Sequence, residues 1–450
     1  MSEVNKAALN GGVSNPDFSM SLRQNGNANK LDHQDRAFHD WYRFVLSFPP
    51  HLVRDYINDF GLGSKSVLLD PFCGTGTTLV ESKLNGISSF GVEANPFAHF
   101  ATSVKIDWDV DPDLLHSRSH EIAETALDIL RRQGIDDETS CDGNIQDLPL
   151  RQLSQEESKL IISGSISPLP LHKILILLDC LKKLENERYY RHLLLALANV
   201  LVFTASNLHF GPEVGVGKPK IDVPIISSWL LKVEEIVNDL QNVAGKAHPY
   251  AQAYFDDARY LDKLPLHSSV DAVITSPPYP NEKDYTRITR LESVVLGFIR
   301  SRRDLQAFKK GLIRSNTRNV YKNDDDDQWI EEHPEIKRIA DEIERRRIEL
   351  GKTSGFERLY GRVTKLYFGG MVRHLATLRF VLRPNARLAY VVGDQASYLR
   401  VMIRTGQILA EIAQSLGYEL VRIDLFRTRF ATATREELRE EVVILRWKGR

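Results

Sequence analysis

The chain has 450 residues, and its 59 lysines and arginines nearly balance its 60 aspartates and glutamates, for a formal net charge of −1. Hydrophobic residues make up 42% and charged residues 26%, as is typical of a globular protein with a sizeable core. This balance excludes a uniformly basic, histone-like protein and a strongly acidic one. It does not exclude an enzyme that acts on nucleic acid, because such binding needs only a local basic surface.

The three cysteines, Cys73, Cys141 and Cys180, are widely separated and form no C-x-x-C pair. Neither a disulfide framework nor a cysteine-ligated metal site is therefore expected. No apolar run approaches the roughly 18 residues of a membrane-spanning helix, and the first residues lack the apolar core of a secretory signal. We expect a cytoplasmic protein with no membrane association and no bound metal.

The predicted elements, taken in chain order, alternate between strands and helices. Residues 1–34 are polar and rich in Asn, Gly and Ser, which predicts a flexible N-terminal arm. From residue 64 onward, short apolar runs alternate with helical patterns, which favours a doubly wound sheet. We predict an α/β, Rossmann-like fold with a mostly parallel, seven-stranded sheet and helical insertions. Strands are expected at 66–70, 90–95, 253–257, 271–276, 387–394, 418–424 and 440–447, and helices at 79–86 and 401–416.

Two insertions interrupt this alternation. Glu93 and Asp257 are 164 residues apart, whereas a strand–helix–strand unit needs only about 30. The intervening chain has helical apolar spacing, and the later insertion is helical and highly charged. The four helices of the first insertion are expected at 114–133, 171–188, 190–206 and 225–242. The sheet domain is therefore predicted in three parts, 35–100, 251–295 and 361–450, with insertions at 101–250, a candidate target-recognition region, and 296–360.

A glycine-containing turn follows the first strand. The strand ends at Asp70, and Gly74 and Gly76 precede a helix, so the backbone can turn tightly and approach a ligand closely. Glu93 ends the next strand 19 residues after Gly74, a spacing at which a carboxylate can accept both hydroxyls of a ribose. Leu79 stands where the third glycine of a dinucleotide fingerprint would fall. An ordinary tight turn between strand and helix is the alternative.

The second motif is Ser276-Pro277-Pro278-Tyr279, which directly follows a predicted strand. Two prolines cannot continue a central strand, so they predict a rigid loop at the sheet edge where α/β folds bind ligands. A planar heterocycle with an exocyclic amine suits this loop: the amine would donate to Ser276 and to the Pro277 carbonyl while Tyr279 stacks on the ring. A proline-rich turn without a function is the alternative.

The segments D-P-F-C-G-T-G at 70–76 and T-S-P-P-Y at 275–279 resemble the S-adenosylmethionine loop and the catalytic loop of amino-group DNA methyltransferases. These enzymes make N4-methylcytosine or N6-methyladenine. Residues 38–57 resemble the segment that helps to hold the methionine end of the cofactor. The cofactor loop precedes the catalytic loop here, unlike the permuted order common among S-P-P-Y enzymes. The resemblance covers about 38–100, 250–295 and 360–450, and neither insertion.

The resemblance implies an S-adenosylmethionine-dependent enzyme that methylates an exocyclic amino group of a base flipped out of duplex DNA. The serine before the prolines favours N4 of cytosine; N6 of adenine and an RNA base are alternatives, and an inactive nucleic-acid-binding protein is a rival of another class. A cognate restriction or defence component is a candidate partner. The resemblance assigns Ser276, Pro277, Pro278 and Tyr279 to the target base, and Asp70, Phe72, Gly74, Gly76, Glu93 and Asp257 (or its neighbour Asp256) to the cofactor.

A basic segment lies in the second insertion. From Arg300 to Asn323, eight basic residues and one acid give a charge of +7 in 24 residues. Because it follows the catalytic loop, we predict that it contacts phosphates, with a solvated helical face as the alternative. The aspartates at 324–327 are expected to mark the edge of that contact. Residues 206–220 are predicted to form either a mobile loop near the target or a plain connector. Three weaker candidates, His39, Trp41 and Asp394, are expected to be structural.

Overall fold

The computed structural model describes residues 31–43, 47–138, 148–211, 213–281, 283–431 and 436–449. Most of the arm predicted at 1–34 therefore lies outside the described residues, as does Cys141. The first described element is a single 3-10 turn, η1 (His33–Asp35). None of the helices in the described ranges combines the length and apolar character that crossing a membrane requires.

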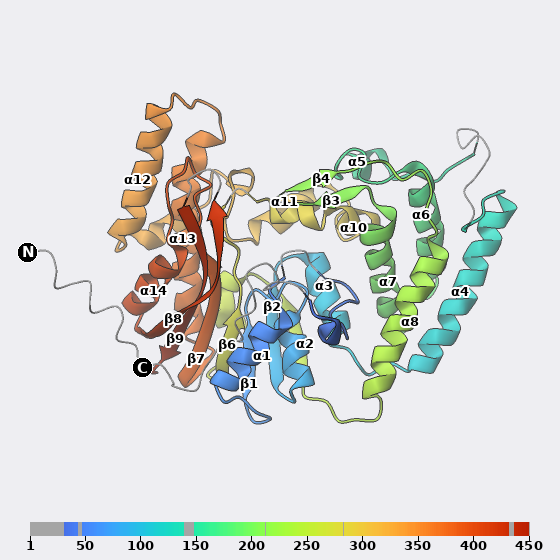
Figure 1. Ribbon diagram of the computed structural model, residues 1–450, viewed down its shortest axis with the longest axis horizontal. Coiled ribbons are helices and arrows are strands. Elements are labelled where there is room, and N and C mark those ends of the chain that lie inside the picture. Colours follow the sequence, from blue (N-terminus) through green and yellow to red (C-terminus); the bar gives the residue numbers. More distant parts are fainter. Residues whose placement is uncertain are drawn as a thin grey trace, which may run out of the picture.

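A seven-stranded sheet forms the centre of the molecule (Figure 1). Its strands are β1 (Val67–Asp70), β2 (Ser88–Glu93), β5 (Ala251–Phe255), β6 (Val270–Thr275), β7 (Leu382–Gly393), β8 (Tyr418–Ala431) and β9 (Glu436–Trp447). The spatial order is β5-β2-β1-β6-β7-β9-β8, with parallel pairing from β5 to β7 and β9 antiparallel to both of its neighbours. The predicted Rossmann-like, mostly parallel α/β sheet is confirmed.

The order of the strands creates a crevice beside β1. The chain leaves β1 for β2 on one side and returns to β6 on the other side, so the connections diverge at this point. In doubly wound sheets, ligands bind at the point where the connections diverge, beyond the carboxyl ends of the strands. Asp70, Glu93 and Thr275 are the last residues of β1, β2 and β6, so these strand ends meet at one edge of the sheet.

Helices cover both faces of the sheet. On one face, α1 (Pro50–Asp59) packs Leu52 and Tyr56 into an apolar cluster with Ile274 and Val391. The opposite face is covered by α13 (Tyr360–Leu378) and α14 (Thr405–Ser415), whose apolar residues share a cluster with strand residues such as Leu69. The remaining helices that flank the sheet are α2 (Thr77–Leu84), α3 (Pro96–Lys105) and η4 (Ala258–Lys263).

The first insertion forms a helical lobe beside the sheet (Figure 1). All four predicted helices are present, and the third continues into a π-helical turn, η3 (Val200–Ala205). The lobe and α3 share one core, in which Phe97 and Val104 of α3 lie in the same cluster as Leu193 and Trp229. The lobe is therefore packed onto the sheet domain. Its helices are α4 (Pro112–Arg132), α5 (Gln155–Ser158), α6 (Pro168–Lys182), α7 (Tyr190–Asn199) and α8 (Ile226–Val243).

Part of the segment 206–220 has regular structure and is therefore not a plain connector, whereas the alternative of a mobile loop near the target stays a prediction. It contains an antiparallel hairpin of β3 (Leu208–Phe210) and β4 (Val214–Val216). Apolar residues alternate along both short strands, a period-2 pattern that is easily missed over three residues.

The second insertion at 296–360, together with the residues just before it, contains helices that run from the catalytic loop to the outside of α13. These are α9 (Tyr285–Ile288), α10 (Arg290–Val295), α11 (Arg302–Lys310), η5 (Thr317–Asn319), η6 (Asp326–Ile330), α12 (Pro334–Glu349) and η7 (Glu357–Leu359). Buried apolar residues of α12 belong to the same cluster as those of α13. The charged pattern of α12 thus belongs to the outer face of a packed helix.

The basic segment at 300–323 is not one continuous exposed surface. The side chain of Arg314 is only 3% exposed, and its Nη2 lies 2.9 Å from Oδ1 of Asp324. Asp326 is also buried and pairs with Arg259 and Arg373. Two of the aspartates predicted to mark the edge of a phosphate contact, Asp324 and Asp326, therefore neutralise internal arginines instead. For Asp325 and Asp327 that role stays a prediction. The exposed basic residues of the segment are Arg300, Arg302, Arg303, Lys310, Arg318 and Lys322.

Candidate functional site

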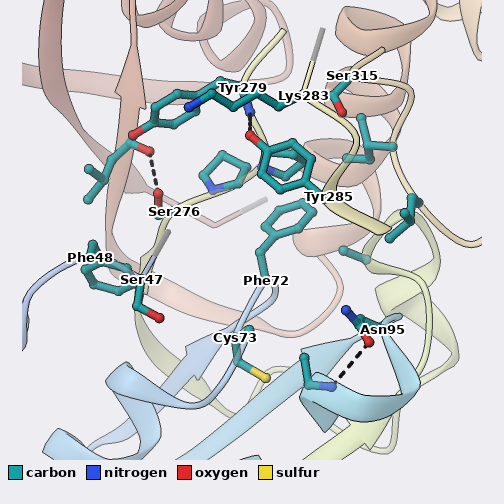
Figure 2. Close-up of a pocket in the computed structure, with 18 of the residues that line it drawn as sticks. Ser47, Phe48, Phe72, Cys73, Asn95, Ser276, Tyr279, Lys283, Tyr285 and Ser315 are labelled. Carbon is teal, nitrogen blue, oxygen red and sulfur yellow. Dashed lines mark hydrogen bonds between the residues drawn. The ribbon is translucent and has the colours of Figure 1, made fainter. Parts of the chain in front are cut away.

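A cavity of about 700 Å³ opens at the carboxyl ends of β1, β2 and β6 (Figure 2). This volume lies within the range of small-molecule sites in proteins. The cofactor loop, the catalytic loop and the end of the β8–β9 hairpin all line it. The predicted site residues that line the cavity are Phe72, Gly74, Glu93, Asp257, Ser276, Pro277, Pro278 and Tyr279. Asp70 and Gly76 adjoin these residues in the chain but are not among those that line the cavity.

The cofactor loop needs glycine at both predicted positions. Gly74 and Gly76 have φ angles of +53° and +85°, a region that favours glycine. A Cβ at Gly76 would lie 2.9 Å from the Thr102 side chain, whose hydroxyl donates to the Gly74 carbonyl at 2.7 Å. At Gly74, by contrast, a Cβ would meet nothing within 4 Å. Thr102 therefore supports the loop from behind, while Gly74 leaves its cavity side open.

Glu93 binds the loop to the end of β2. Its Oε2 accepts a hydrogen bond from the Gly74 amide at 2.8 Å, and its Oε1 accepts one from the Asn95 amide at 2.7 Å. Burial raises the pKa of this carboxyl to about 7. Each carboxylate oxygen has a second lone pair, so the group can accept further hydrogen bonds from a ligand in the cavity.

Asp70 connects the two predicted loops. Its Oδ1 accepts hydrogen bonds from the Thr275 hydroxyl at 2.6 Å and from the Phe72 amide at 3.0 Å. Its Oδ2 is buried and has no hydrogen-bond partner among the described residues. Burial raises the pKa of Asp70 to about 6. An unpartnered, buried carboxylate oxygen costs free energy unless a donor reaches it.

The catalytic loop is held in place by contacts on both sides. The hydroxyl of Ser276 donates to the Val391 carbonyl at 3.2 Å, and the Tyr279 amide donates to the Tyr285 hydroxyl at 3.1 Å (Figure 2). The Tyr279 ring lies against Gly393, where a Cβ would come within 3.0 Å of the ring. Burial raises the pKa of Tyr279, which keeps its phenol neutral. The loop thus presents a rigid hydroxyl, a carbonyl edge and an aromatic ring.

The two aspartates after β5 differ in their contacts. Both oxygens of Asp257 bind Arg259: Oδ1 accepts from its amide at 2.9 Å and its Nε at 3.0 Å, and Oδ2 accepts from its Nη2 at 2.6 Å. Asp256 is exposed and lines the cavity, and its Oδ1 accepts from the Asp257 amide. Asp256 therefore has more unused acceptor capacity than Asp257.

The three weaker candidates make internal contacts. Nε2 of His39 lies 2.9 Å from Oε1 of Glu81, and the Trp41 indole donates to Asp239. The carboxylate of Asp394 accepts a hydrogen bond from Arg404 at 2.5 Å. Within the described ranges, no group of three or more His, Cys, Asp or Glu side chains could hold a metal ion.

Curated relatives align with most of this chain. It is 24% identical to the Type II methyltransferase M.BsoBI of Geobacillus stearothermophilus, over 90% of this chain and 83% of that protein. It is also 24% identical to the Type II methyltransferase M.AvaI of Nostoc, over 93% of this chain and 87% of the relative. No family model matches the chain. The chain is thus similar to Type II methyltransferases over most of its length. Together with the Rossmann-like sheet, this relationship supports an enzymatic methyltransferase.

A shorter match involves a third protein of the same description. Over 69 residues, the chain is 35% identical to the Type II methyltransferase M.MjaII of Methanocaldococcus jannaschii, which covers 15% of this chain and 13% of that protein. The two long alignments span both insertions as well as the sheet domain, since they cover nine-tenths of the chain. The relationship therefore extends beyond the two loop motifs.

Several residues that line the cavity were not predicted as site residues. Tyr285 and Lys283 lie only a few residues after the S-P-P-Y motif, so their proximity along the chain was an available signal. Arg429 and Glu440 come from β8 and β9, and no local pattern connects them with a motif more than a hundred residues away. Asn281 and Arg427 are further lining residues that were not predicted. Ser47 and Phe48 line the cavity within the segment 38–57, and Glu213 lines it within the segment 206–220, although neither segment was predicted residue by residue.

Proposed function

We propose that this chain is a site-specific DNA methyltransferase that uses S-adenosylmethionine and modifies an exocyclic amino group, with N4 of cytosine favoured. One observation carries the proposal: the glycine loop and the S-P-P-Y loop line the same cavity and are joined by the hydrogen bond from Thr275 to Asp70. The relatives' description as Type II methyltransferases supports it and adds a cognate restriction component as a candidate partner. A cytoplasmic location belongs to the same proposal.

The residues around the cofactor loop fit S-adenosylmethionine. Asp70 offers a buried carboxylate oxygen without a partner, which suits the ammonium group of the methionine end. Glu93 would accept the ribose hydroxyls, and the open side of Gly74 leaves room for the ligand. For the adenine amine we favour Asp256 over Asp257, because Arg259 already uses both oxygens of Asp257. When bound, S-adenosylmethionine supplies an electrophilic methyl group on a sulfonium.

The S-P-P-Y loop would activate the amine of the target base. An exocyclic amine is a weak nucleophile because its lone pair is delocalised into the ring. Since the Ser276 hydroxyl donates its hydrogen bond to the Val391 carbonyl, its oxygen lone pairs are free to accept a hydrogen bond from the amine. The Pro277 carbonyl would accept a hydrogen bond from the second N–H of the amine, and the two bonds together favour a pyramidal nitrogen. Tyr279 would stack on the flipped base.

Proximity would supply much of the remaining rate enhancement. When an enzyme holds two reactants in the correct geometry, the activation free energy falls by at most roughly 7–11 kcal/mol. The rigid prolines and the packing of Tyr279 against Gly393 provide such orientation on the side of the base. This chemistry requires neither a metal nor a covalent nucleophile, and Cys73 belongs to the cofactor loop and is buried.

We assign a peripheral DNA contact to the exposed part of the basic segment. The helix α11 begins with Arg302 and Arg303, both exposed, and Lys310 ends it. Charge reversal of Arg302 and Arg303 is expected to weaken DNA binding and its dependence on salt. The same reversal at Arg345, exposed on α12, is the matched control. We likewise assign target recognition to the helical lobe at 101–250.

The decisive experiment is a filter assay with labelled S-adenosylmethionine on duplex DNA, single-stranded DNA and RNA, followed by identification of the modified nucleoside. N4-methylcytosine in duplex DNA is the expected product; N6-methyladenine would correct the base, and label in RNA alone would overturn the substrate. Binding of DNA without transfer to any nucleic acid would indicate an inactive binding protein. Ser276→Ala should depress transfer while leaving cofactor affinity nearly unchanged.

A further inference from the structure

Basic side chains gather at the catalytic end of the cavity. Lys283 follows the S-P-P-Y loop, and Arg427 and Arg429 project from β8 into the same cavity. Lys283 lies beside Tyr279, on the far side of the cavity from the cofactor loop (Figure 2). These three cations therefore line the same cavity as the S-P-P-Y loop, although none of them belongs to either loop motif.

The carboxylate closest to these arginines is already occupied. The side chain of Glu440 is only 6% exposed, and it accepts hydrogen bonds from Nε of Arg427 at 2.5 Å and from Nη2 at 3.0 Å. Arg429 is the second guanidinium at this carboxylate, with its Nε 3.1 Å from Oε1. That contact is not a hydrogen bond, and the buried Nε of Arg429 has no hydrogen-bond partner among the described residues.

The ammonium group of Lys283 is also without a strong partner. It makes no ion pair within the described part of the chain, and its side chain is partly buried. Burial lowers the pKa of Lys283 and the nearby Arg429 lowers it further, against the opposing effects of Glu440 and Glu213. Two cations that repel each other in a half-buried cavity are stabilised when an anion lies between them.

We propose that Lys283 and Arg429 bind the DNA phosphodiester next to the extruded target nucleotide. This assignment rests on the proposed function. A nucleotide that leaves the duplex brings its own phosphates to the mouth of the cavity. These phosphates supply the negative charge that Lys283 lacks, and they complement Arg429, which shares a single carboxylate with Arg427. The planar guanidinium of Arg429 matches phosphate oxygens, and Lys283 adds a point charge. Glu440 and Arg427 act as positioning residues that orient Arg429.

The test compares Lys283→Gln and Arg429→Gln with the wild-type protein. The probe is a short, fluorescein-labelled duplex with one mismatched cytosine, because a mismatched base is more easily extruded. Affinity is measured by anisotropy over a series of salt concentrations in the presence of S-adenosylmethionine. Each variant should bind about tenfold more weakly at low salt, and the slope of log affinity against log salt should fall by roughly 0.9 for each phosphate that is no longer neutralised. Cofactor affinity should be unchanged.

Two further variants serve as controls. Arg429→Lys keeps the charge and should retain most of the salt slope, whereas a purely structural role of Arg429 would not be rescued in this way. Arg446→Gln removes an arginine from the opposite end of β9, where it pairs with Glu419, and should bind like wild type. If Arg429→Gln does not fold, as judged by its thermal midpoint, Lys283→Gln provides the same test.

The outcomes separate this inference from the proposed function. A weaker variant whose salt slope equals that of wild type would assign the side chain to the base or to the fold, and would overturn the phosphate contact. Wild-type slopes and affinities in both glutamine variants would overturn it as well. Absence of methyl transfer by the wild-type protein would instead count against the proposed function, while the binding slopes would still test the contact.

Discussion

The hydroxyl of Thr275 donates a hydrogen bond of 2.6 Å to Oδ1 of Asp70, and this contact joins the carboxyl ends of β6 and β1. Thr275 directly precedes the S-P-P-Y loop, and Asp70 directly precedes the glycine loop. Both residues are completely buried. A displacement of either loop is therefore transmitted to the other through a short, buried hydrogen bond, which couples the two halves of the cavity.

Replacement of Thr275 by Val tests this coupling. The substitution keeps the shape of the side chain but removes one of the two donors to the buried Oδ1 of Asp70, whose other donor is the Phe72 amide, and the loss costs about 1–3 kcal/mol. We expect weaker binding of S-adenosylmethionine and slower methyl transfer, together with a lower thermal midpoint. Titration calorimetry and the filter assay measure the two effects. Thr125→Val, at an exposed position of α4, is the matched control, and equal behaviour of the two variants would contradict the coupling.

The pH dependence of cofactor binding should depend on Asp70. Burial raises its pKa to about 6, so part of the population is protonated in weakly acidic solution. A cationic ligand beside Oδ2 favours the ionised form, and binding therefore releases a proton. Affinity for S-adenosylmethionine should rise with pH through about 6 and level off above it, by at most about tenfold per pH unit.

Calorimetry in two buffers of different ionisation enthalpy measures this proton release directly. Asp70→Asn should bind the cofactor more weakly and should lose the rise near pH 6. Glu93, whose pKa burial raises to about 7, retains its own contribution in that variant, so Glu93→Gln is the necessary companion. Parallel pH profiles for wild type and Asp70→Asn would contradict a direct charge interaction between Asp70 and the cofactor.

Both site motifs could be predicted from the sequence because each combines a strand end with residues that force a loop. Pro277 and Pro278 must leave the sheet, and Gly76 can adopt a φ of +85°. The partners of charged residues could not be predicted. The charge of Arg314 suggested a surface contact, yet Asp324, ten residues later, folds back onto it in the interior. Charge patterns along a chain do not reveal which charges neutralise one another.

The same limit applies to the far side of the cavity. Arg429 and Glu440 reach the S-P-P-Y loop only because β9 is inserted antiparallel between β7 and β8. The alternating pattern of these strands predicts their existence but not their position in the sheet. The contact between Tyr279 and Gly393 is of the same kind, since it depends on the register of β6 with β7.

Gly76→Ala should distort the backbone of the cofactor loop, although Gly76 itself does not line the cavity. The φ of +85° is strained for alanine, and the new Cβ would lie 2.9 Å from Thr102. We expect a loss of about 1–3 kcal/mol in the free energy of unfolding and a weaker cofactor complex. Gly63→Ala is the control, because its φ is not positive and a Cβ there meets nothing within 4 Å. Denaturant titration distinguishes the two, and an unchanged stability of Gly76→Ala would contradict the role of Thr102 as a support.

Tyr285 holds the S-P-P-Y loop in place, and its replacement should slow methyl transfer. Its hydroxyl accepts the hydrogen bond of the Tyr279 amide, so Tyr285→Phe leaves that amide unpaired next to the assigned target-base position. An unpaired buried amide costs about 1–3 kcal/mol and allows the loop to shift. Because the cofactor loop is untouched, we expect kcat to fall at least tenfold while the affinity for S-adenosylmethionine stays close to that of wild type.

Tyr250→Phe, which removes an exposed hydroxyl bound to Gln252, is the control and should leave both quantities unchanged. A loss of cofactor affinity in Tyr285→Phe that exceeds its loss of kcat would show that Tyr285 supports the whole cavity and not the catalytic loop alone.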